Sequence, residues 1–395
     1  MRRPIRSGTV VRLSAGLLLG ALLVAGCGGA SSTPRPTPHR SSAPAPSPGV
    51  AACSNRSVLA GWTVDQLAEQ VVAIPVQETD VGAVQAEVAQ GAGGILLFGS
   101  TAPTDLGAQL HTLESSAPHG IAPLVMTDEE GGGVQRMANL VGSIPWARVM
   151  GSTMTPAEIE SLAESTGRAM LAQGVTMDLA PVLDVDGGVG PNADDPDGSR
   201  SFSDQATVAG RDGIAFADGL LAAGVIPVAK HFPGLGGASG NTDDGPAATL
   251  PYSTLETSGL LPFTDAITDG LPAVMVANAS VPGLTSSPAS LSAAVIQGLL
   301  VKQLHFRGLV LTDSLSAGAI ADLGLSVAQA TVQALEAGAD MVMFASGNPA
   351  QVTAAIDSSV GIAVQGGELL RTRLVGAAAQ VLSAKGVDLC SARSG

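Results

Sequence analysis

The pattern that most constrains this chain is an alternation of short apolar runs with longer Ala-rich segments. Eight runs rich in β-forming residues occupy residues 71–76, 94–98, 123–127, 176–182, 225–229, 273–277, 308–312 and 340–344. Runs that are hydrophobic throughout, rather than at every second position, are typical of parallel strands covered on both faces. The intervening segments have helical character, notably residues 156–173, 203–223, 255–269, 290–304 and 326–337.

Eight strand–helix units predict an α/β fold, a (β/α)8 TIM-type barrel in a single catalytic domain, which we place at residues 53–395. The main competitor is an open, doubly wound sheet that binds a nucleotide. Such a sheet carries a GxGxxG turn after its first strand, whereas residues 77–80 here read Gln-Glu-Thr-Asp. The barrel is therefore the favoured architecture.

The charge balance excludes one large class of partner. The chain has 34 Asp and Glu against 19 Lys and Arg, a formal charge of −15, and only 3% aromatic residues. An acidic surface with few aromatic side chains repels phosphate backbones, so we expect no nucleic-acid partner. The 45% of hydrophobic residues is sufficient for a packed core, which argues against a disordered chain.

The first 26 residues have the layout of an export signal, because four arginines precede the apolar run 17–24. Residues 23–27, Leu-Val-Ala-Gly-Cys, resemble a bacterial lipobox, in which the cysteine (Cys27) is acylated and becomes the mature N-terminus. An ordinary signal peptide with an incidental cysteine is the alternative. Residues 27–52 then form a Ser/Pro-rich tether. We expect an exported, monomeric lipoprotein, held by its lipid on the extracytoplasmic face of the cell membrane.

Two further cysteines, Cys53 and Cys390, stand at the two ends of the expected barrel. Export would place them in an oxidising compartment, so we expect a disulfide between them, with two buried free thiols as the alternative. No cysteine and histidine spacing typical of zinc occurs in the sequence.

Polar residues follow five of the eight apolar runs. They are Asp128-Glu129-Glu130, Asp184, Lys230-His231, Asn278 and Asp313. The C-terminal ends of the strands in a (β/α)8 barrel meet at one face, which carries the catalytic groups. Carboxylates on a water-filled rim add little stability, so these residues indicate a functional site rather than a structural feature.

The same residues lie in six motifs, at 127–136, 180–185, 200–202, 230–234, 288–292 and 308–315. Through these motifs and their order, residues 60–385 resemble the catalytic domain of glycoside hydrolase family 3. The resemblance is strongest to the family's single-domain β-N-acetylglucosaminidases of peptidoglycan turnover. It implies a retaining exo-β-N-acetylhexosaminidase that releases terminal N-acetylglucosamine from muropeptides or peptidoglycan fragments, and it implies no metal and no other cofactor.

Retaining cleavage requires a carboxylate that attacks the anomeric carbon and an acid that protonates the leaving oxygen. The resemblance implies that Asp313 is the nucleophile; a helix N-cap is the alternative, because Ser314 and a helix follow directly. The residues that the resemblance assigns to the hydroxyls of the terminal sugar are Asp128, Arg136, Arg200, Lys230 and His231. Charged groups suit this task because charge-assisted hydrogen bonds are short and directional.

Two of the motif residues have a second interpretation. Arg136 equally fits an ion pair with a neighbouring acid. Asp184 is either a site group or a structural residue that fixes the Lys230 side chain or the Arg200 loop. These alternatives remain open at the level of sequence.

The sequence departs from its family in the loop after the fifth strand. β-N-Acetylglucosaminidases of this branch carry an Asp–His pair there, whereas residues 234–247 contain no histidine. Asp243 or Asp244 then serves as the acid, which requires a pKa raised by burial or a like charge. Otherwise the acid comes from another loop, or the protein cleaves weakly or only binds glycan. Asn278 is a second departure, because the family often has His at that position.

The Asp-rich residues 184–198 could suggest a calcium site. Their spacing fails the calcium-binding EF-hand pattern, so we expect a polar loop. Within the enzymes, the nearest rival function is a β-glucosidase or β-xylosidase. The rival from another class is a catalytically silent glycan-binding lipoprotein.

Overall fold

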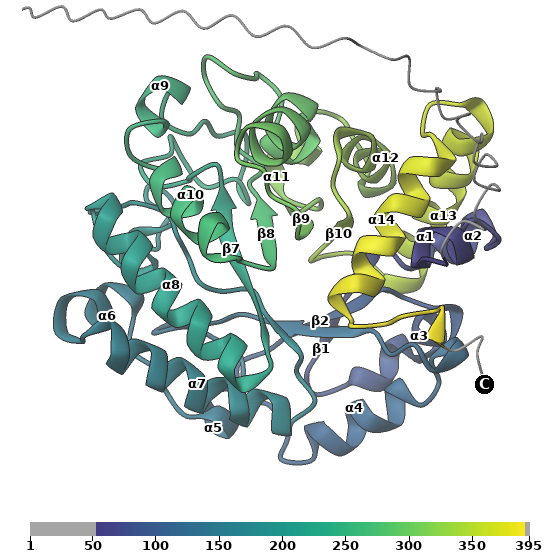
Figure 1. Cartoon of the computed structure of the whole chain (residues 1–395), viewed down its shortest axis with the longest axis horizontal. Helices are drawn as coiled ribbons and strands as arrows, with labels where there is room; N and C mark the ends of the chain where they lie inside the picture. The colour runs from purple at the N-terminus through teal and green to yellow at the C-terminus, as the bar shows by residue number, and fades with distance from the viewer. Residues whose placement is uncertain (1–52, 392–395) are drawn as a thin grey trace, which may run out of the picture. The chain divides into compact units, whose positions relative to one another are not determined.

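The eight apolar runs form the strands of one closed, parallel barrel. The computed structural model describes residues 53–391 (Figure 1). In order around the barrel, the strands are β1 (Val72–Gln77), β2 (Gly94–Phe98), β3 (Leu124–Thr127), β6 (Met177–Asp178), β7 (Ile226–Phe232), β8 (Ala273–Val276), β9 (Leu309–Ser314) and β10 (Met341–Met343). Parallel pairing of β10 with β1 closes the barrel. The predicted (β/α)8 architecture is confirmed.

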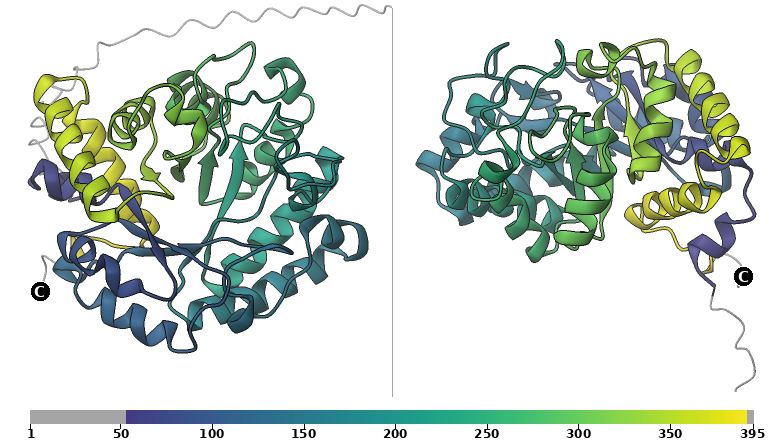
Figure 2. Two further views of the ribbon diagram at one scale, coloured as in Figure 1. Left: turned by 180° about the vertical axis from the view of Figure 1, so that it is seen from behind. Right: turned by 90° about the horizontal axis from the view of Figure 1, so that it is seen from above.

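Helices surround the barrel, as the two views of Figure 2 show. The α-helices are α1 (Asn55–Leu59), α2 (Val64–Glu69), α3 (Gln85–Gln90), α4 (Leu106–Glu114), α5 (Ala138–Val141), α6 (Ala147–Thr153), α7 (Pro156–Ala172), α8 (Ala206–Ala223), α9 (Tyr252–Leu255), α10 (Leu260–Asp269), α11 (Gly318–Ala321), α12 (Val327–Ala337), α13 (Pro349–Gly366) and α14 (Arg371–Ala384). Shorter or irregular helical turns are η1 (Val81–Val84), η2 (Pro118–Gly120), η3 (Gly198–Arg200), η4 (Ala289–Leu291) and η5 (Ala294–Gln303). A small hairpin, β4 (Glu129–Gly131) with β5 (Val134–Gln135), was not expected from the sequence.

Local sequence explains where these helices begin and end. At α7, the Thr155 hydroxyl accepts from the backbone N–H of Glu158 and the Glu158 carboxylate accepts from Thr155 in return. The single helix expected over 255–269 is instead two helices, α9 and α10. Pro262 has no N–H to donate, so it fits only in the first turn of a helix, and a new helix has to start just before it.

The core has two layers, inside and outside the barrel wall. The inside is filled by alternate side chains of the strands, among them Leu96, Met126, Met275 and Leu311. The outside packs against the helices, as the edge-to-face contact of Phe232 on β7 and Phe263 on α10 illustrates, with ring centroids 5.4 Å apart. Both strand faces are therefore buried, which accounts for the uninterrupted apolar runs.

The two ends of the described chain are joined covalently by a disulfide between Cys53 and Cys390, which closes a loop of 337 residues. The Asn55 amide donates to the carbonyl of Val387 at 2.7 Å and accepts from the N–H of Leu389 at 2.9 Å beside it. Within residues 53–391, none of the helices has the length and apolar character needed to cross a bilayer. The expected signal peptide (1–26), lipidated Cys27 and tether (27–52) lie outside the described residues.

Candidate active site

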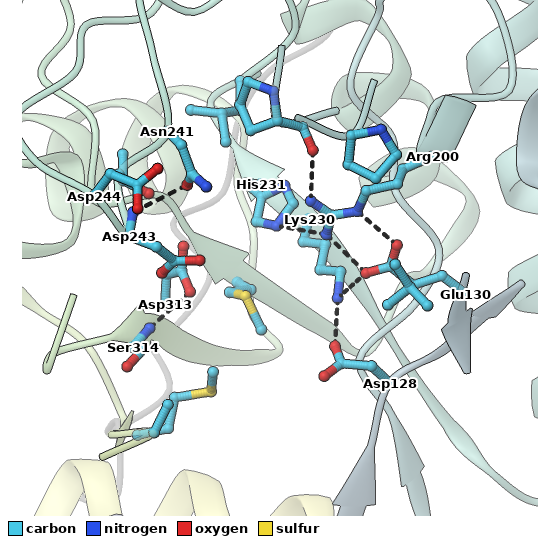
Figure 3. Close-up of a pocket in the computed structure, with 18 of the residues that line it drawn as sticks. Asp128, Glu130, Arg200, Lys230, His231, Asn241, Asp243, Asp244, Asp313 and Ser314 are labelled. Atoms are coloured by element: carbon cyan, nitrogen blue, oxygen red, sulfur yellow. Dashed lines mark hydrogen bonds and ion pairs between the residues drawn. The ribbon is translucent and has the colours of Figure 1, made fainter. Parts of the chain in front are cut away.

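One pocket gathers every residue that the sequence assigns to catalysis or sugar binding. The pocket has a volume of about 520 Å³ and lies at the C-terminal ends of the barrel strands. Its lining includes Asp128, Arg136, Arg200, Lys230, His231, Asp243, Asp244 and Asp313 (Figure 3). Its apolar floor is formed by Leu96, Met275 and Met343, which belong to β2, β8 and β10.

A network of ion pairs forms one wall of the pocket. The ammonium of Lys230, near the end of β7, lies 2.7 Å from Asp128 Oδ1 and 2.5 Å from Glu130 Oε1. The Arg200 guanidinium binds the same Glu130 through two parallel hydrogen bonds, each 2.8 Å long. Arg136 pairs with Asp128 at 3.4 Å, as one interpretation expected; it also lines the pocket, and its contact with a sugar stays a prediction.

Opposite charges keep this wall ionised although it is buried. Burial opposes the charge of Glu130, but the Arg200 and Lys230 cations outweigh it and hold the pKa of Glu130 well below its usual range. Burial likewise opposes the charge of Asp128, and chiefly Lys230 brings the pKa of Asp128 below its ordinary value. The pKa of Lys230 is raised, because Asp128 and Glu130 outweigh the effect of burial. Fixed donors and acceptors of this kind suit the ring of hydroxyls on a sugar.

Glu130 was not singled out from the sequence, although its motif was recognised. Three acids stand side by side at 128–130, and only the alternation of side chains along an extended segment separates them. Asp128 and Glu130 face the pocket. Glu129 faces the other way and accepts from the backbone N–H groups of Arg136 and Met137, at 2.7 and 2.6 Å. This alternation could have been used in the sequence to place Glu130 on the same side as Asp128.

His231 is held as a neutral acceptor by Asp184. Its Nδ1 lies 2.7 Å from Asp184 Oδ2, which also accepts from its backbone N–H at 3.0 Å. Its Nε2 lies 3.4 Å from the Arg200 guanidinium, which can only donate, so the imidazole proton sits on Nδ1. Burial and the Arg200 charge lower the pKa of His231 to about 4. Asp184 is therefore a structural residue, but the expectation that it fixes Lys230 or the Arg200 loop is corrected, because its partners are His231 and Leu235.

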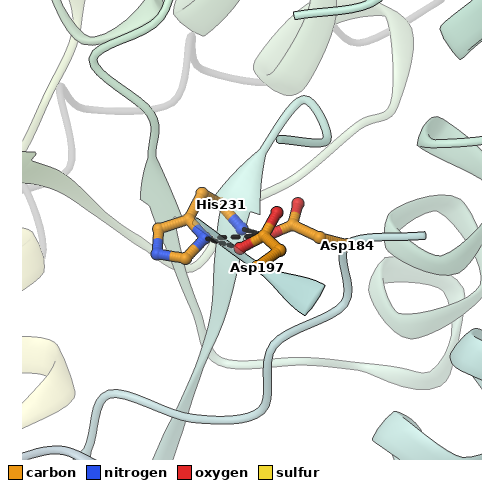
Figure 4. Close-up of side chains that lie close together, drawn as sticks. All are labelled: Asp184, Asp197 and His231. Carbon is orange, nitrogen blue, oxygen red and sulfur yellow. Dashed lines mark hydrogen bonds and ion pairs between the residues drawn. The ribbon is translucent and has the colours of Figure 1, made fainter. Parts of the chain in front are cut away.

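Asp197 completes a buried cluster with Asp184 and His231 (Figure 4). One ligand-type atom from each of the three residues lies within 4.8 Å of the others. Neither carboxylate oxygen of Asp197 accepts a hydrogen bond from residues 53–391. Burial raises the pKa of Asp197 well above its ordinary value. The two Asp184 oxygens already accept hydrogen bonds from three donors. The main role of the cluster is therefore to hold His231 in place.

Asp313 stands near the end of β9, on the other side of the pocket from the ion pairs. One of its oxygens accepts from the N–H of Ser314 at 2.7 Å. Burial raises the pKa of Asp313, and the charge of Asp243 adds to this effect, while the N–H of Ser314 and the Lys230 cation oppose it. Figure 3 shows the Asp243 carboxyl beside that of Asp313, with Asp244 directed further away.

The loop that carries Asp243 is anchored to the segment after β9. The N–H groups of Gly318 and Ala319 donate to the carbonyls of Asp243 and Thr242, at 3.0 and 2.9 Å. The Asn241 side chain accepts from the N–H of Asp243 at 3.0 Å. The chain thus fixes the loop acid and Asp313 relative to each other through backbone contacts.

Asn278, the second departure from the family pattern, does not line the pocket. Its amide donates to the Ser314 carbonyl at 2.7 Å and accepts from the Ser290 hydroxyl at 2.6 Å. It therefore supports the backbone directly behind Asp313.

Comparison with known proteins agrees with this geometry. The model of the glycosyl hydrolase family 3 N-terminal domain matches residues 63–384. The chain is 37% identical over 337 residues to the β-hexosaminidase LpqI of Mycobacterium tuberculosis, which covers 82% of each protein. The solved structure of M. tuberculosis LpqI superposes with a TM-score of 0.77 at 32% identity, covering 85% of this chain and 97% of that one.

A second solved structure, the β-N-acetylhexosaminidase of Beutenbergia cavernae, superposes with a TM-score of 0.75 at 29% identity, covering 83% of this chain and all of the other. The family model spans all eight strands and the whole pocket. This chain belongs to glycosyl hydrolase family 3, whose members cleave glycosidic bonds.

Proposed function

We propose that the protein is a retaining exo-β-N-acetylhexosaminidase, in which Asp313 attacks the anomeric carbon and Asp243 protonates the leaving oxygen. One observation carries the proposal: the carboxyl of Asp313 at the end of β9 and that of Asp243 on the loop after β7 lie side by side in a pocket whose opposite wall is a charged network. Two carboxyl groups are the minimum that retaining cleavage needs. Its relatives named β-hexosaminidase and β-N-acetylhexosaminidase support the same activity.

The two carboxyls have environments that suit different roles. Burial raises the pKa of Asp313, but the N–H of Ser314 and the Lys230 cation favour its ionised form and offset part of that effect. Loss of solvent raises the pKa of Asp243, and the like charge of the adjacent Asp244 raises it further. An acid with a raised pKa keeps its proton closer to neutral pH, which is what a general acid requires.

In the proposed reaction, a terminal sugar enters with its hydroxyls toward Asp128, Glu130, Arg200 and Lys230. Asp313 forms a covalent bond to the anomeric carbon while the glycosidic bond breaks and its oxygen takes the proton of Asp243. Asp243, now ionised, removes a proton from water, which attacks the same carbon and releases Asp313. Neutral His231 can accept a hydrogen bond from a sugar hydroxyl at Nε2, because Asp184 accepts the proton of its other nitrogen.

The direct test is hydrolysis of aryl β-glycosides with and without the 2-acetamido group by the purified protein. We expect turnover of the N-acetylglucosaminide and much slower turnover of the glucoside and xyloside. Asp313→Asn should abolish turnover without changing the melting temperature by more than about 2 °C, since it preserves volume. Faster cleavage of the glucoside or xyloside would support the rival glycosidase. Sugar-dependent thermal stabilisation without any turnover would support a glycan-binding lipoprotein.

We further propose that the substrate is a peptidoglycan fragment and that the protein is a monomeric lipoprotein on the outer side of the cell membrane. An export signal and lipobox in residues 1–27 support this location, as does the disulfide between Cys53 and Cys390. Mass spectrometry of N-acetylglucosamine released from muropeptides, compared with chitobiose, tests the substrate. Metabolic labelling of wild type and Cys27→Ser with a clickable fatty acid tests the anchor.

A further inference from the structure

The loop between β6 and α8 supplies both Arg200 and part of the lining of the active-site pocket. Arg200 donates to Glu130 at 2.8 Å and, through Nη1, to the loop carbonyl of Pro196 at 3.1 Å. Four further residues of the loop line the pocket, namely Pro191, Asn192, Ala193 and Pro196. The position of this loop therefore decides where the Arg200 guanidinium lies.

The head of this loop has no hydrophobic anchor of its own. Residues 187–199 contain four glycines and two prolines, and their one large apolar side chain, Val189, is 91% exposed. Two backbone hydrogen bonds close the neck of the loop, from Ser199 N–H to the Gly190 carbonyl at 2.8 Å and from Asp186 N–H to the Ser203 carbonyl at 3.2 Å. A segment with so few buried apolar contacts opens easily unless polar contacts hold it.

Arg148 of α6 lies in this neck. Its Nη2 donates to the carbonyls of Asp186 and Gly198, the second at 3.1 Å, and its Nε donates to the Ser201 carbonyl at 3.2 Å. Asp186 precedes the head of the loop and Gly198 follows it, so one side chain ties the two ends together. All the hydrogen bonds that this guanidinium makes with residues 53–391 go to these three carbonyls.

The helix that carries Arg148 lies outside the barrel and packs against η3 and α8 (Figure 1). Arg148 is not among the residues that line the pocket. A guanidinium presents five N–H donors in one plane, which suits several carbonyl oxygens at once, whereas an ammonium is a compact point charge. The residue type therefore fits a clamp on backbone carbonyls rather than a contact with substrate.

We propose that Arg148 is a positioning residue for the reaction, which holds the loop so that Arg200 meets Glu130 and the terminal sugar. The kinetic part of this inference rests on the proposed function, whereas the order of the loop can be measured without any turnover. Arg148 is remote from Asp313 and Asp243, so its loss should weaken sugar binding and leave the chemical step in place.

The test compares wild type with Arg148→Met, which keeps an unbranched side chain and removes every donor. We expect KM for an aryl N-acetylglucosaminide to rise by about tenfold, with kcat changed by less than about threefold, because a displaced Arg200 loses a charge-assisted contact. Hydrogen–deuterium exchange should become at least about tenfold faster in residues 187–199 and stay unchanged in the barrel strands. Arg148→Lys should restore only part of both properties, since an ammonium cannot span the three carbonyls.

Arg168→Met is the matched control, because it removes an exposed arginine of α7 that pairs with Glu164. It should keep the KM and the exchange pattern of wild type. The proposal is overturned if Arg148→Met has wild-type KM and wild-type exchange in the loop. Faster exchange throughout the barrel also overturns it, because Arg148 would then be a residue of general stability. So does a loss that falls on kcat instead of KM, or full rescue by Arg148→Lys.

Failure of the proposed function gives a different result. If wild type cleaves no glycoside, the role of Arg148 is judged by loop exchange and by calorimetric titration with N-acetylglucosamine. Arg148→Met should then still show the faster loop exchange and an affinity for the sugar about tenfold lower than that of wild type. Equal affinity and equal exchange in the two proteins would refute the clamp whatever the reaction is.

Discussion

Glu130 and Arg200 form a two-point ion pair in the wall of the pocket, with Nε–Oε2 and Nη2–Oε1 distances of 2.8 Å each. The same Glu130 oxygen that meets Nη2 also lies 2.5 Å from the Lys230 ammonium. One carboxylate therefore fixes two cations, and both cations belong to the proposed sugar site. Without this carboxylate, the buried cations Arg200 and Lys230 would have less negative charge beside them.

We expect Glu130→Ala to lower the free energy of unfolding by about 3 to 5 kcal/mol, the cost of breaking a buried ion pair on one side. Glu130→Gln should cost less and should raise KM more than it lowers kcat, because the displaced cations bind substrate rather than react with it. Denaturant unfolding and steady-state kinetics measure the two effects. The control is Glu164→Gln, which breaks the exposed pair with Arg168 and should cost less than about 1 kcal/mol. Equal losses of unfolding free energy in Glu130→Ala and Glu164→Gln would refute the importance of the buried ion pair.

The proposed acid can be separated from the nucleophile by the choice of leaving group. Asp243→Asn should reduce kcat/KM for a natural disaccharide by about 10² to 10⁴, the usual contribution of a general acid. An aryl glycoside with a strongly acidic phenol needs no protonation, so its first step should be almost unaffected. Asp244→Asn is the matched control and should keep activity on both substrates. If Asp244→Asn shows the leaving-group dependence instead, the acid is Asp244.

The pH profile of kcat/KM should reveal the effect of Asp244 on Asp243. The acid works while protonated, so activity falls as pH rises through the pKa of Asp243. Loss of solvent raises the pKa of Asp243, and the Asp244 charge raises it further. Asp244→Asn therefore lowers this pKa and moves the alkaline limb to lower pH. The acidic limb, which follows ionisation of Asp313, should stay in place; an unmoved alkaline limb would contradict the assignment.

The barrel could be predicted from the sequence because each strand is buried on both faces and so appears as an uninterrupted apolar run. The polar residues at strand ends were equally readable, since closure of the barrel brings those ends together. The direction in which a loop side chain points could not be predicted from the sequence. Asp243 and Asp244 are neighbours in an irregular loop, and only the contacts of that loop with Gly318 and Ala319 decide which carboxyl faces Asp313.

Contacts between segments far apart in the sequence were the second feature that could not be predicted. The sequence left Asp184 open between a site group and a structural residue, because its partner is set by the packing of two loops rather than by spacing along the chain. The broken helix at 255–269 is different, because Pro262 was visible in the sequence and its missing N–H already required a helix start nearby. Glu69 of α2 and Asp357 of α13 line one hollow although they are almost 300 positions apart in the sequence, so no local pattern marks this contact.

The disulfide should contribute stability through the length of the loop it closes. Cys53 and Cys390 are separated by 337 residues, and a link across so long a loop restricts the unfolded chain strongly. We expect Cys53→Ser to lower the free energy of unfolding by about 2 to 5 kcal/mol. Unfolding of wild type in reducing agent should match the variant. The hydrogen bonds of Asn55 to residues near Cys390 keep the two ends together in the folded state, so activity at 25 °C should persist. A variant as stable as the oxidised wild type would show that the link adds nothing.

Gly318 gives a way to move the proposed acid without removing it. Its N–H donates to the Asp243 carbonyl at 3.0 Å, and a Cβ at this position would lie only 2.7 Å from the Asp244 carbonyl carbon and 2.8 Å from the Asp243 oxygen. Gly318→Ala therefore pushes the 241–245 loop away from Asp313. Because a displacement of about 1 Å can cost a hundredfold in rate, we expect kcat for a natural disaccharide to fall by about 10 to 10².

The matched control is Gly324→Ala, a nearby glycine with open space around its Cβ position, although its positive φ adds a small local strain. It should leave kcat unchanged. Gly318→Ala should, like Asp243→Asn, lose little activity on an aryl glycoside with a strongly acidic phenol, because the nucleophile stays in place. If kcat falls equally for both substrates, the loop positions Asp313 rather than the acid. If neither slows, the contact between Gly318 and the loop has no catalytic role, and the acid must come from elsewhere in the pocket.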